Sequence, residues 1–349
     1  MPVYISSYVS GFQSIVKELL LGLLHDVKIV NLYDGVVVYR TNKSLDVIKS
    51  SGFLNNTFLV IDTFKKGNKV SIENCMKDFV KIKKYEQEAR TYLKTNKFRT
   101  FRIITSVEGK LKSVDKNILR NAENKVSKDY NVVPNRVKPE VEFWFLTRSE
   151  GVCYFLLRLT KHKSFDKTLQ KGELRPDIAS ILCLMSEPKK QDVFWDPFCG
   201  YGAIPIQRLK FNNCEKVYST DIESEKVNFV KNKVNHSKIN KNKVSVEKVD
   251  FFHNNKFKYN SIDKIVTDPP WGDYEILNGR AIDYYKKFMM KCSGYLKDSG
   301  ILVFISSKKD EIDEVLSEMQ EVFIVKNKLD ILLSGKKVGV YKIVKKQSI

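Results

Sequence analysis

The regular alternation of apolar runs and helical patterns after residue 190 is the feature that most constrains how this 349-residue chain can fold. Short apolar runs at 193–195, 216–220, 244–249 and 262–266 have the length and composition of buried strands. The segments between them carry apolar residues at helical spacing. Strands that alternate with helices form a mostly parallel sheet with crossover helices on both faces. We therefore predict an α/β fold with a Rossmann-like domain over residues 186–349.

An acidic residue follows each of these four apolar runs at or near its end, namely Asp196, Asp221, Asp250 and Asp268. The carboxyl ends of parallel strands meet at one edge of a sheet, and ligands of such sheets bind at that edge. A buried charge is costly unless it is paired or bound. Four acids at successive strand ends therefore indicate a ligand site rather than packing.

A glycine-bearing turn follows the first of these acids, in the run Asp196-Pro197-Phe198-Cys199-Gly200-Tyr201-Gly202. Its glycines would let the backbone approach a ligand closely. The turn lacks the Gly-Lys-Ser/Thr end of a phosphate-binding P-loop, and it has too few glycines for the dinucleotide fingerprint. Asp221 lies roughly twenty residues further on, where a ribose diol would be held. Asp250 and Phe251 supply an acid and a ring that could meet an adenine edge and face.

The run Asp268-Pro269-Pro270-Trp271 is expected to be stiff, because each proline restricts both itself and the residue before it. A rigid carboxylate beside an aromatic ring suits a planar substrate that carries an amine. The alternative is a proline-terminated strand followed by a surface turn.

Composition narrows the class of partner. The formal net charge of +20 favours polyanions such as RNA, DNA or an anionic membrane surface, although it could also serve solubility alone. No apolar segment approaches the roughly twenty residues that span a bilayer. The six cysteines include no Cys-x-x-Cys pair, and the four histidines show no ligand spacing. We therefore expect a cytoplasmic protein without a metal site, a disulfide framework or a membrane segment.

The first 160 residues read as two small α+β regions. The first has strands at 3–8, 27–30, 36–39 and 57–61, with helices at 11–24 and 45–50. The second has a long helix at 71–93, a strand at 100–107, a helix at 114–129 and a hairpin at 141–159. A loop at 161–171 then precedes a helix that begins at Pro176 and is closed by Pro188.

The series of motifs from Asp196 to Trp271 resembles that of class I S-adenosylmethionine-dependent methyltransferases that alkylate exocyclic amines. The form Asp-Pro-Phe-Cys-Gly followed by Ile204-Pro205 is similar to the THUMP-domain RNA guanine-N2 methyltransferases. That family has a ferredoxin-like domain, a THUMP domain, a linker and a Rossmann-like catalytic domain. The resemblance therefore implies these domains at 1–64, 65–160, 161–185 and 186–349, with specific motifs only in residues 172–306.

The resemblance also implies roles for individual residues. The S-adenosylmethionine site would comprise Arg175, Asp196, Phe198, Cys199, Gly200, Gly202, Asp221, Asp250 and Phe251. The catalytic residues would be Asp268, Pro269, Pro270 and Trp271. The expected partner is RNA, with tRNA as the favoured substrate, and the expected state is a monomer.

Two departures from the family pattern leave alternatives open. Tyr201 stands where Ser is common, and Trp271 stands where guanine-N2 enzymes usually have Tyr or Phe. Trp at the latter position also occurs in adenine-N6 enzymes. The alternatives are an adenine-N6 methyltransferase acting on DNA or RNA, and a non-catalytic RNA-binding protein on a methyltransferase fold. The intact acids at all four strand ends argue against the second.

Overall fold

The computed structural model describes residues 1–65, 70–83, 86–160, 169–211, 214–237, 240–253, 256–272, 277, 279–333 and 335–347. Most of the loop predicted at 161–171 lies outside the described residues. The chain divides into two compact units. Unit 1 comprises residues 1–7, 21–50 and 54–162, and unit 2 comprises residues 8–20, 51–53 and 163–349.

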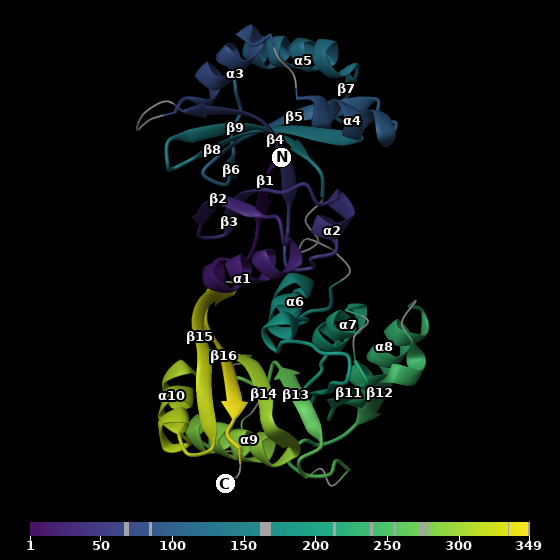
Figure 1. Cartoon of the computed structure of the whole chain (residues 1–349), viewed down its shortest axis with the longest axis vertical. Coiled ribbons are helices and arrows are strands. Elements are labelled where there is room, and N and C mark those ends of the chain that lie inside the picture. Colours follow the sequence, from purple (N-terminus) through teal and green to yellow (C-terminus); the bar gives the residue numbers. More distant parts are fainter. Residues whose placement is uncertain are drawn as a thin grey trace. The chain divides into compact units, whose positions relative to one another are not determined.

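Unit 1 is built on one nine-stranded sheet (Figure 1). Its strands follow the order β2 (Lys28–Tyr33), β3 (Val36–Arg40), β1 (Val3–Ser7), β4 (Thr57–Lys65), β9 (Val152–Arg158), β8 (Val141–Arg148), β5 (Thr100–Val107) and β6 (Lys110–Leu111), and β7 (Val133–Pro134) pairs with β5. Strand β4 pairs with β1 on one side and with β9 on the other. The regions predicted as separate domains at 1–64 and 65–160 therefore share one continuous sheet.

The helices of unit 1 are α2 (Leu45–Lys49), α3 (Ile72–Lys81), α4 (Gln87–Thr95) and α5 (Lys116–Tyr130). Helices α3, α4 and α5 lie along the same face of the sheet (Figure 1). The prediction of one long helix over 71–93 is wrong, because Ile82 has an extended backbone (φ −70°, ψ 130°) that ends α3. The buried positions of α3 end at Phe79, and Val80 and Lys81 after it are exposed.

Unit 2 contains the predicted α/β sheet. Its strands follow the order β12 (Val244–Lys248), β11 (Lys216–Asp221), β10 (Val193–Asp196), β13 (Ile262–Thr267), β14 (Leu296–Ser306), β16 (Lys336–Lys345) and β15 (Phe323–Leu333). The first five strands are parallel, and the last two are antiparallel to their neighbours. From β10 the chain continues to β11 and β12 on one side, and β13 then pairs on the other side of β10. The carboxyl ends of β10 and β13 therefore mark the switch point of the sheet, where ligands of such sheets bind.

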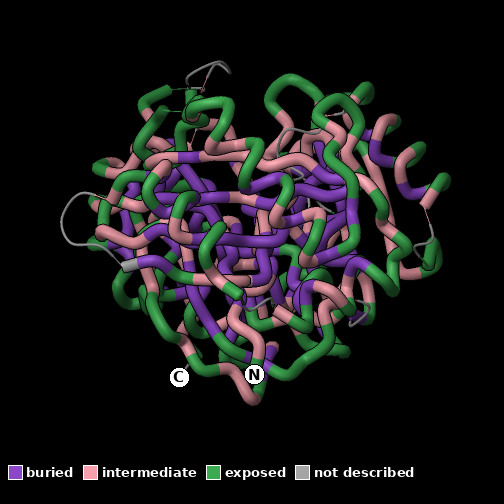
Figure 2. The backbone as a smooth tube through the Cα atoms, turned by 90° about the horizontal axis from the view of Figure 1, so that it is seen from above, coloured by how far each residue is buried: buried purple, intermediate pink, exposed green. Residues whose placement is uncertain are grey.

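Helices cover both faces of this sheet. They are α6 (Pro176–Met185), α7 (Ala203–Lys210), α8 (Ser224–Asn235), the short 3-10 helix η1 (Lys241–Lys243), α9 (Ala281–Tyr295) and α10 (Lys309–Glu318). Successive strand residues point to opposite faces. The ring of Phe194 meets the Arg208 guanidinium of α7 at 5.7 Å, whereas the ring of Trp195 meets Tyr295 of α9 at 5.2 Å. Figure 2 shows the buried stretches of chain enclosed by exposed ones.

A segment near the start of the chain belongs to unit 2. Helix α1 (Gln13–Leu23) lies mostly within residues 8–20. Gly11, just before it, has φ +91°, and a Cβ there would lie 2.3 Å from the Asp330 carbonyl oxygen in β15. Only glycine fits such a close approach of two backbones.

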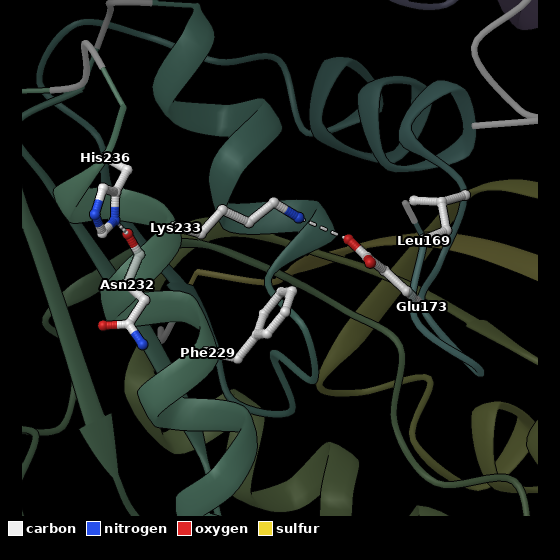
Figure 3. Close-up of a pocket in the computed structure, with 6 residues that line it drawn as sticks. All are labelled: Leu169, Glu173, Phe229, Asn232, Lys233 and His236. Atoms are coloured by element: carbon white, nitrogen blue, oxygen red, sulfur yellow. Dashed lines mark hydrogen bonds and ion pairs between the residues drawn. The ribbon is translucent and has the colours of Figure 1, made fainter. Parts of the chain in front are cut away.

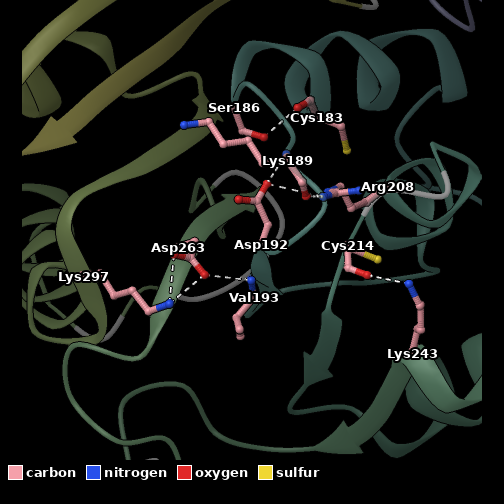
Figure 4. Close-up of polar contacts among 10 residues, drawn as sticks. All are labelled: Cys183, Ser186, Lys189, Asp192, Val193, Arg208, Cys214, Lys243, Asp263 and Lys297. Carbon is pink, nitrogen blue, oxygen red and sulfur yellow. Dashed lines mark hydrogen bonds and ion pairs between the residues drawn. The ribbon is translucent and has the colours of Figure 1, made fainter.

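The amino-terminal edge of the unit 2 sheet holds its charges in internal pairs (Figure 4). Asp192 accepts a hydrogen bond from the Lys189 N–H at 2.6 Å and lies 3.4 Å from the buried Arg208 guanidinium. Asp263 accepts from the Val193 N–H at 2.8 Å and from the Lys297 ammonium at 2.9 Å. Within the described parts of the chain, no helix is long and apolar enough to cross a membrane.

Candidate active site

Asp196 lies at the end of β10 and is 1% exposed. Its Oδ1 accepts a hydrogen bond from the Thr267 hydroxyl at 2.7 Å and from the Phe198 N–H at 3.3 Å. Its Oδ2 has no hydrogen-bond partner among the described residues. Burial, followed by the charges of Asp221 and Asp268, raises the pKa of Asp196 well above its usual value. A buried carboxyl group with an unused oxygen calls for a donor or a cation from outside the chain.

The turn after Asp196 requires its two glycines. Gly200 has φ +51°, and its N–H donates to Asp221 Oδ2 at 2.8 Å. Gly202 has φ +83°, and a Cβ there would lie 2.8 Å from Val230 Cγ2 in α8. L-residues with side chains rarely adopt such backbone angles. The turn is therefore held close to α8, with an open left-handed bend at Gly200.

Cys199 sits inside this turn rather than at its surface. Its N–H donates to the Thr220 carbonyl at 2.9 Å, and the residue is 5% exposed. Burial, together with the charge of Asp196, raises the pKa of the Cys199 thiol well above its usual value. The thiol stays neutral and is unsuited to act as a nucleophile.

Asp221 ends β11 and joins the first two strand ends. Besides the Gly200 N–H, its carboxylate accepts the Glu223 N–H at 2.9 Å. The residue is 7% exposed, so its carboxylate is fixed at the sheet edge by backbone donors. This is the position at which the sequence predicted an acid for a ribose diol.

Asp250 and Phe251 follow β12, and the structure gives them different surroundings. The Asp250 side chain is 38% exposed and accepts from the Phe252 N–H at 2.9 Å and from His253 at 2.8 Å. Burial acts to raise the pKa of Asp250, but these hydrogen bonds outweigh it and the pKa is lowered. Phe251 is 2% exposed, and its ring packs at 5.0 Å from that of Phe198. Both rings therefore belong to the aromatic core beneath the strand ends.

Arg175 is the N-cap residue of α6 and pairs with a side chain of the same helix. Its Nε lies 3.1 Å from Asp177 Oδ1, and its guanidinium is 31% exposed. The pair fixes the orientation of the guanidinium at the helix start. Its predicted contact with a cofactor stays a prediction.

The Asp268–Trp271 run follows β13 directly. Asp268 is partly exposed and Pro269 is buried. The Trp271 indole N–H donates to the Ile305 carbonyl at 3.1 Å, and the Tyr285 hydroxyl donates to the Pro270 carbonyl at 3.0 Å. The run is therefore anchored to neighbouring elements and does not behave as a loose surface turn.

Some residues of this site carried no clear sequence signal. Thr267, which holds Asp196, directly precedes Asp268, and its position at a strand end could have indicated a hydroxyl in the site. Tyr285 and Ile305 contact the run from 15 and 34 residues away in the chain. Because they are so distant in the chain, no local sequence pattern links them to the run.

A hollow of about 450 Å³ adjoins the glycine turn (Figure 3). It is lined by Leu169, Glu173, Phe229, Asn232, Lys233 and His236. The Lys233 ammonium lies 2.7 Å from the Glu173 carboxylate, and the Phe229 ring meets that of Tyr201 at 5.2 Å. The residues that line it do not include any of the predicted site residues, so the hollow is a neighbour of the site.

The residues at the strand ends fit S-adenosylmethionine, the methyl donor that the sequence resemblance implies. The unused Asp196 oxygen suits a cationic or hydrogen-bond-donating group, and the turn at Gly200 leaves room for close backbone approach. Asp221 and Asp250 place two further carboxylates along the same edge of the sheet.

Comparisons with known proteins agree with this arrangement. Residues 165–331 match the family described as RMKL-like, methyltransferase domain. A relative from Methanothermococcus thermolithotrophicus, described as a probable tRNA (guanine(10)-N2)-dimethyltransferase, is 32% identical over 156 residues, which are 43% of this chain and 91% of the relative. A tRNA (guanine(10)-N2)-dimethyltransferase from Methanocaldococcus jannaschii is 27% identical over 168 residues, which are 46% of this chain and 45% of the relative.

Solved structures show the same fold. The crystal structure of TrmN from Thermus thermophilus superposes with a TM-score of 0.76 at 17% identity, covering 99% of this chain and 100% of that one. The predicted α/β fold class with a Rossmann-like methyltransferase domain is therefore confirmed. The chain belongs to the RMKL-like methyltransferase domain family, and it is an S-adenosylmethionine-dependent methyltransferase.

Proposed function

We propose that this methyltransferase methylates the exocyclic N2 amine of a guanosine in tRNA. The observation that carries the proposal is the anchored Asp268–Trp271 run beside the Asp196 turn. Two relatives whose names specify tRNA guanine-N2 dimethylation support this choice of base and RNA.

The chemical problem is the weak nucleophilicity of an aromatic amine, whose lone pair is delocalised into the ring. When bound, S-adenosylmethionine supplies a methyl group on a positively charged sulfur. The Asp268 carboxylate accepts one N–H of the amine and the Pro269 carbonyl accepts the other. This orientation directs the nitrogen lone pair towards the methyl carbon, and such positioning can contribute several kcal/mol. Asp268 need not be a strong base, because the alkylated nitrogen becomes acidic.

The target base must leave its stack to reach this site, at a cost of a few kcal/mol. Stacking on Trp271 offsets part of that cost, by about 1–3 kcal/mol for one base. The Trp271 indole is already fixed by its bond to Ile305, so little side-chain freedom is lost on binding.

Residues 65–160 serve in this proposal as a THUMP-like RNA-binding domain. The net charge of +20 supports contact with phosphates. Arg102 and Arg158 both pair with the buried Glu142, so these two cations are engaged within the protein. The exposed lysines Lys110, Lys112 and Lys138 are better placed to meet RNA. The resulting affinity would fall steeply with salt.

We also infer that the protein acts as a monomer in the cytoplasm. All six cysteines are buried thiols outside any disulfide, which suits a reducing compartment. Size-exclusion chromatography with light scattering would test the monomer, and a mass of twice the chain would contradict it.

The test is methyl transfer from labelled S-adenosylmethionine to bulk tRNA, rRNA and DNA, followed by nucleoside analysis. We expect N2-methylguanosine in tRNA and a loss of about 10²–10³-fold in kcat for Asp268→Ala. The control is Asp298→Ala, which lies near the start of β14, whereas Ile305 at the end of that strand contacts the site. This variant should retain activity. Methylated adenine would favour the N6 alternative. Unchanged activity of Asp268→Ala would contradict the mechanism.

A further inference from the structure

The carbonyl of Pro270 has a dedicated hydrogen-bond donor. The Tyr285 hydroxyl, from α9, donates to Pro270 O at 3.0 Å. The same hydroxyl oxygen lies 2.6 Å from Ser306 Oγ at the end of β14. A carbonyl can only accept, so the Tyr285 proton goes to Pro270 and the Ser306 hydroxyl donates to Tyr285. Ser306 Oγ in turn accepts the Lys308 N–H at 3.1 Å.

The two hydroxyl groups at the centre of this chain of hydrogen bonds are buried, and so is the bond between them. Tyr285 and Ser306 are both 0% exposed, and the Tyr285 ring packs edge-on against Phe288 at 6.3 Å. Buried hydrogen bonds with fixed donors hold a single geometry, because an unmade bond leaves a costly unsatisfied group. The Pro270 carbonyl is therefore locked in orientation.

A second bond joins the next residue of the run to the same strand end. The Trp271 indole N–H donates to Ile305 O at 3.1 Å. Ile305 and Ser306 are the last two residues of β14, which runs parallel to β13 with Thr267 opposite Phe304. Two successive residues of the run are thus attached to one rigid strand end.

We propose that Tyr285, oriented by Ser306, is a positioning residue for methyl transfer. Its hydroxyl occupies the Pro270 carbonyl with a hydrogen bond inside the protein. The Pro269 carbonyl and Asp268 are then the groups that face the amine. Tyr285 also sets the angle between the Asp268 carboxylate and the Trp271 ring. The methyltransferase activity needs this angle, since a misplacement of about 1 Å can reduce a rate roughly 10²-fold. The inference rests on the proposed function for the amine substrate and for the roles of Asp268 and the Pro269 carbonyl.

The decisive comparison is Tyr285→Phe with Tyr341→Phe. Both tyrosines are 0% exposed, and the Tyr341 hydroxyl lies 3.5 Å from the Lys309 carbonyl oxygen at the start of α10, a longer distance than the 3.0 Å from Tyr285 to Pro270. Each change removes one buried hydroxyl and keeps the ring. We expect Tyr285→Phe to lower kcat about 10–100-fold with an unchanged Kd for S-adenosylmethionine. Tyr341→Phe should leave kcat within about twofold. Ser306→Ala should also lower kcat, as Tyr285→Phe does, because it removes the hydroxyl donor that orients Tyr285.

A readout independent of activity separates this inference from the proposed function. The protein has three tryptophans, whose indole N–H signals can be resolved in a sample labelled with ¹⁵N-tryptophan and assigned by Trp→Phe changes. Tyr285→Phe should speed hydrogen exchange at the Trp271 indole and leave Trp195 and Trp144 unchanged. Exchange that is equal in Tyr285→Phe and Tyr341→Phe, or a kcat that is equally reduced in both, would overturn the proposal. A wild type that methylates no RNA would instead refute the substrate, and the exchange result would still stand.

Discussion

Replacing Gly202 by alanine tests how tightly the cofactor turn is held against α8. The backbone at Gly202 has φ +83°, where an L-residue loses about 1–2 kcal/mol. The added Cβ would lie 2.8 Å from Val230 Cγ2 and 3.1 Å from Val230 Cγ1. Val230 is 0% exposed, so it cannot swing into solvent. Such overpacking typically costs about 1–3 kcal/mol, which gives a total loss of about 2–5 kcal/mol for Gly202→Ala.

Gly200→Ala is the matched control. Gly200 has φ +51°, but within the described chain no heavy atom lies within 4 Å of the added Cβ. Only the backbone term remains, so the expected loss is about 1–2 kcal/mol. The difference between the two variants therefore isolates the contact with Val230.

Urea unfolding measures these losses. Trp144 lies in unit 1, so a Trp144→Phe background leaves Trp195 and Trp271 to report on unit 2 by fluorescence. A shift in midpoint at constant slope identifies a change in stability. Val230→Ala should partly relieve Gly202→Ala, with a coupling of about 0.5–3 kcal/mol. Equal losses for the two glycine variants, or strictly additive effects of Gly202→Ala and Val230→Ala, would refute the reasoning.

Two further predictions concern buried charges. Asp196→Asn should stabilise the protein without cofactor, and the gain should grow as pH rises from about 4 towards the raised pKa of Asp196. Over that window the carboxyl group ionises in the unfolded chain but stays protonated when buried. A gain that does not vary with pH in urea titrations would contradict this prediction. Arg208→Met removes the guanidinium that pairs with the buried Asp192 and should cost about 3–5 kcal/mol. Arg280→Met, which breaks an exposed pair with Asp283, should cost at most about 1 kcal/mol in the same thermal or urea assay, and similar losses for the two variants would argue against a structural role for Arg208.

The strand ends of unit 2 could be predicted because their chemistry is local in sequence. Each acid lies at or just after the end of an apolar run. The run predicts a strand, and the carboxyl end of that strand places the acid at the ligand-binding edge of the sheet. Asp196 and Asp221 end their strands as predicted, and Asp268 follows β13 directly. The parallel pairing of β10 with β11 and of β11 with β12 follows from the intervening helices α7 and α8.

Other features depend on contacts that the sequence does not display. The helix predicted over 71–93 breaks at Ile82, a position where the local residues permit either outcome and the end of the buried face decides. Helix α1 lies mostly in unit 2 because Gly11 meets Asp330, more than 300 residues away in the chain. Strand β4 joins two regions that appear separate in sequence, because its edges pair with β1 and β9.

The site shows the same division between reacting groups and their supports. A carboxylate next to prolines and an aromatic ring is a rare combination, and its chemistry restricts it to few residue types. The groups that hold it need only a hydroxyl or a carbonyl at the right place, and many residues can supply one. Tyr285 and the Ile305 carbonyl therefore leave no pattern in the sequence, although they fix the geometry on which the rate depends. Structure adds most to the sequence where a role is defined by position and not by residue type.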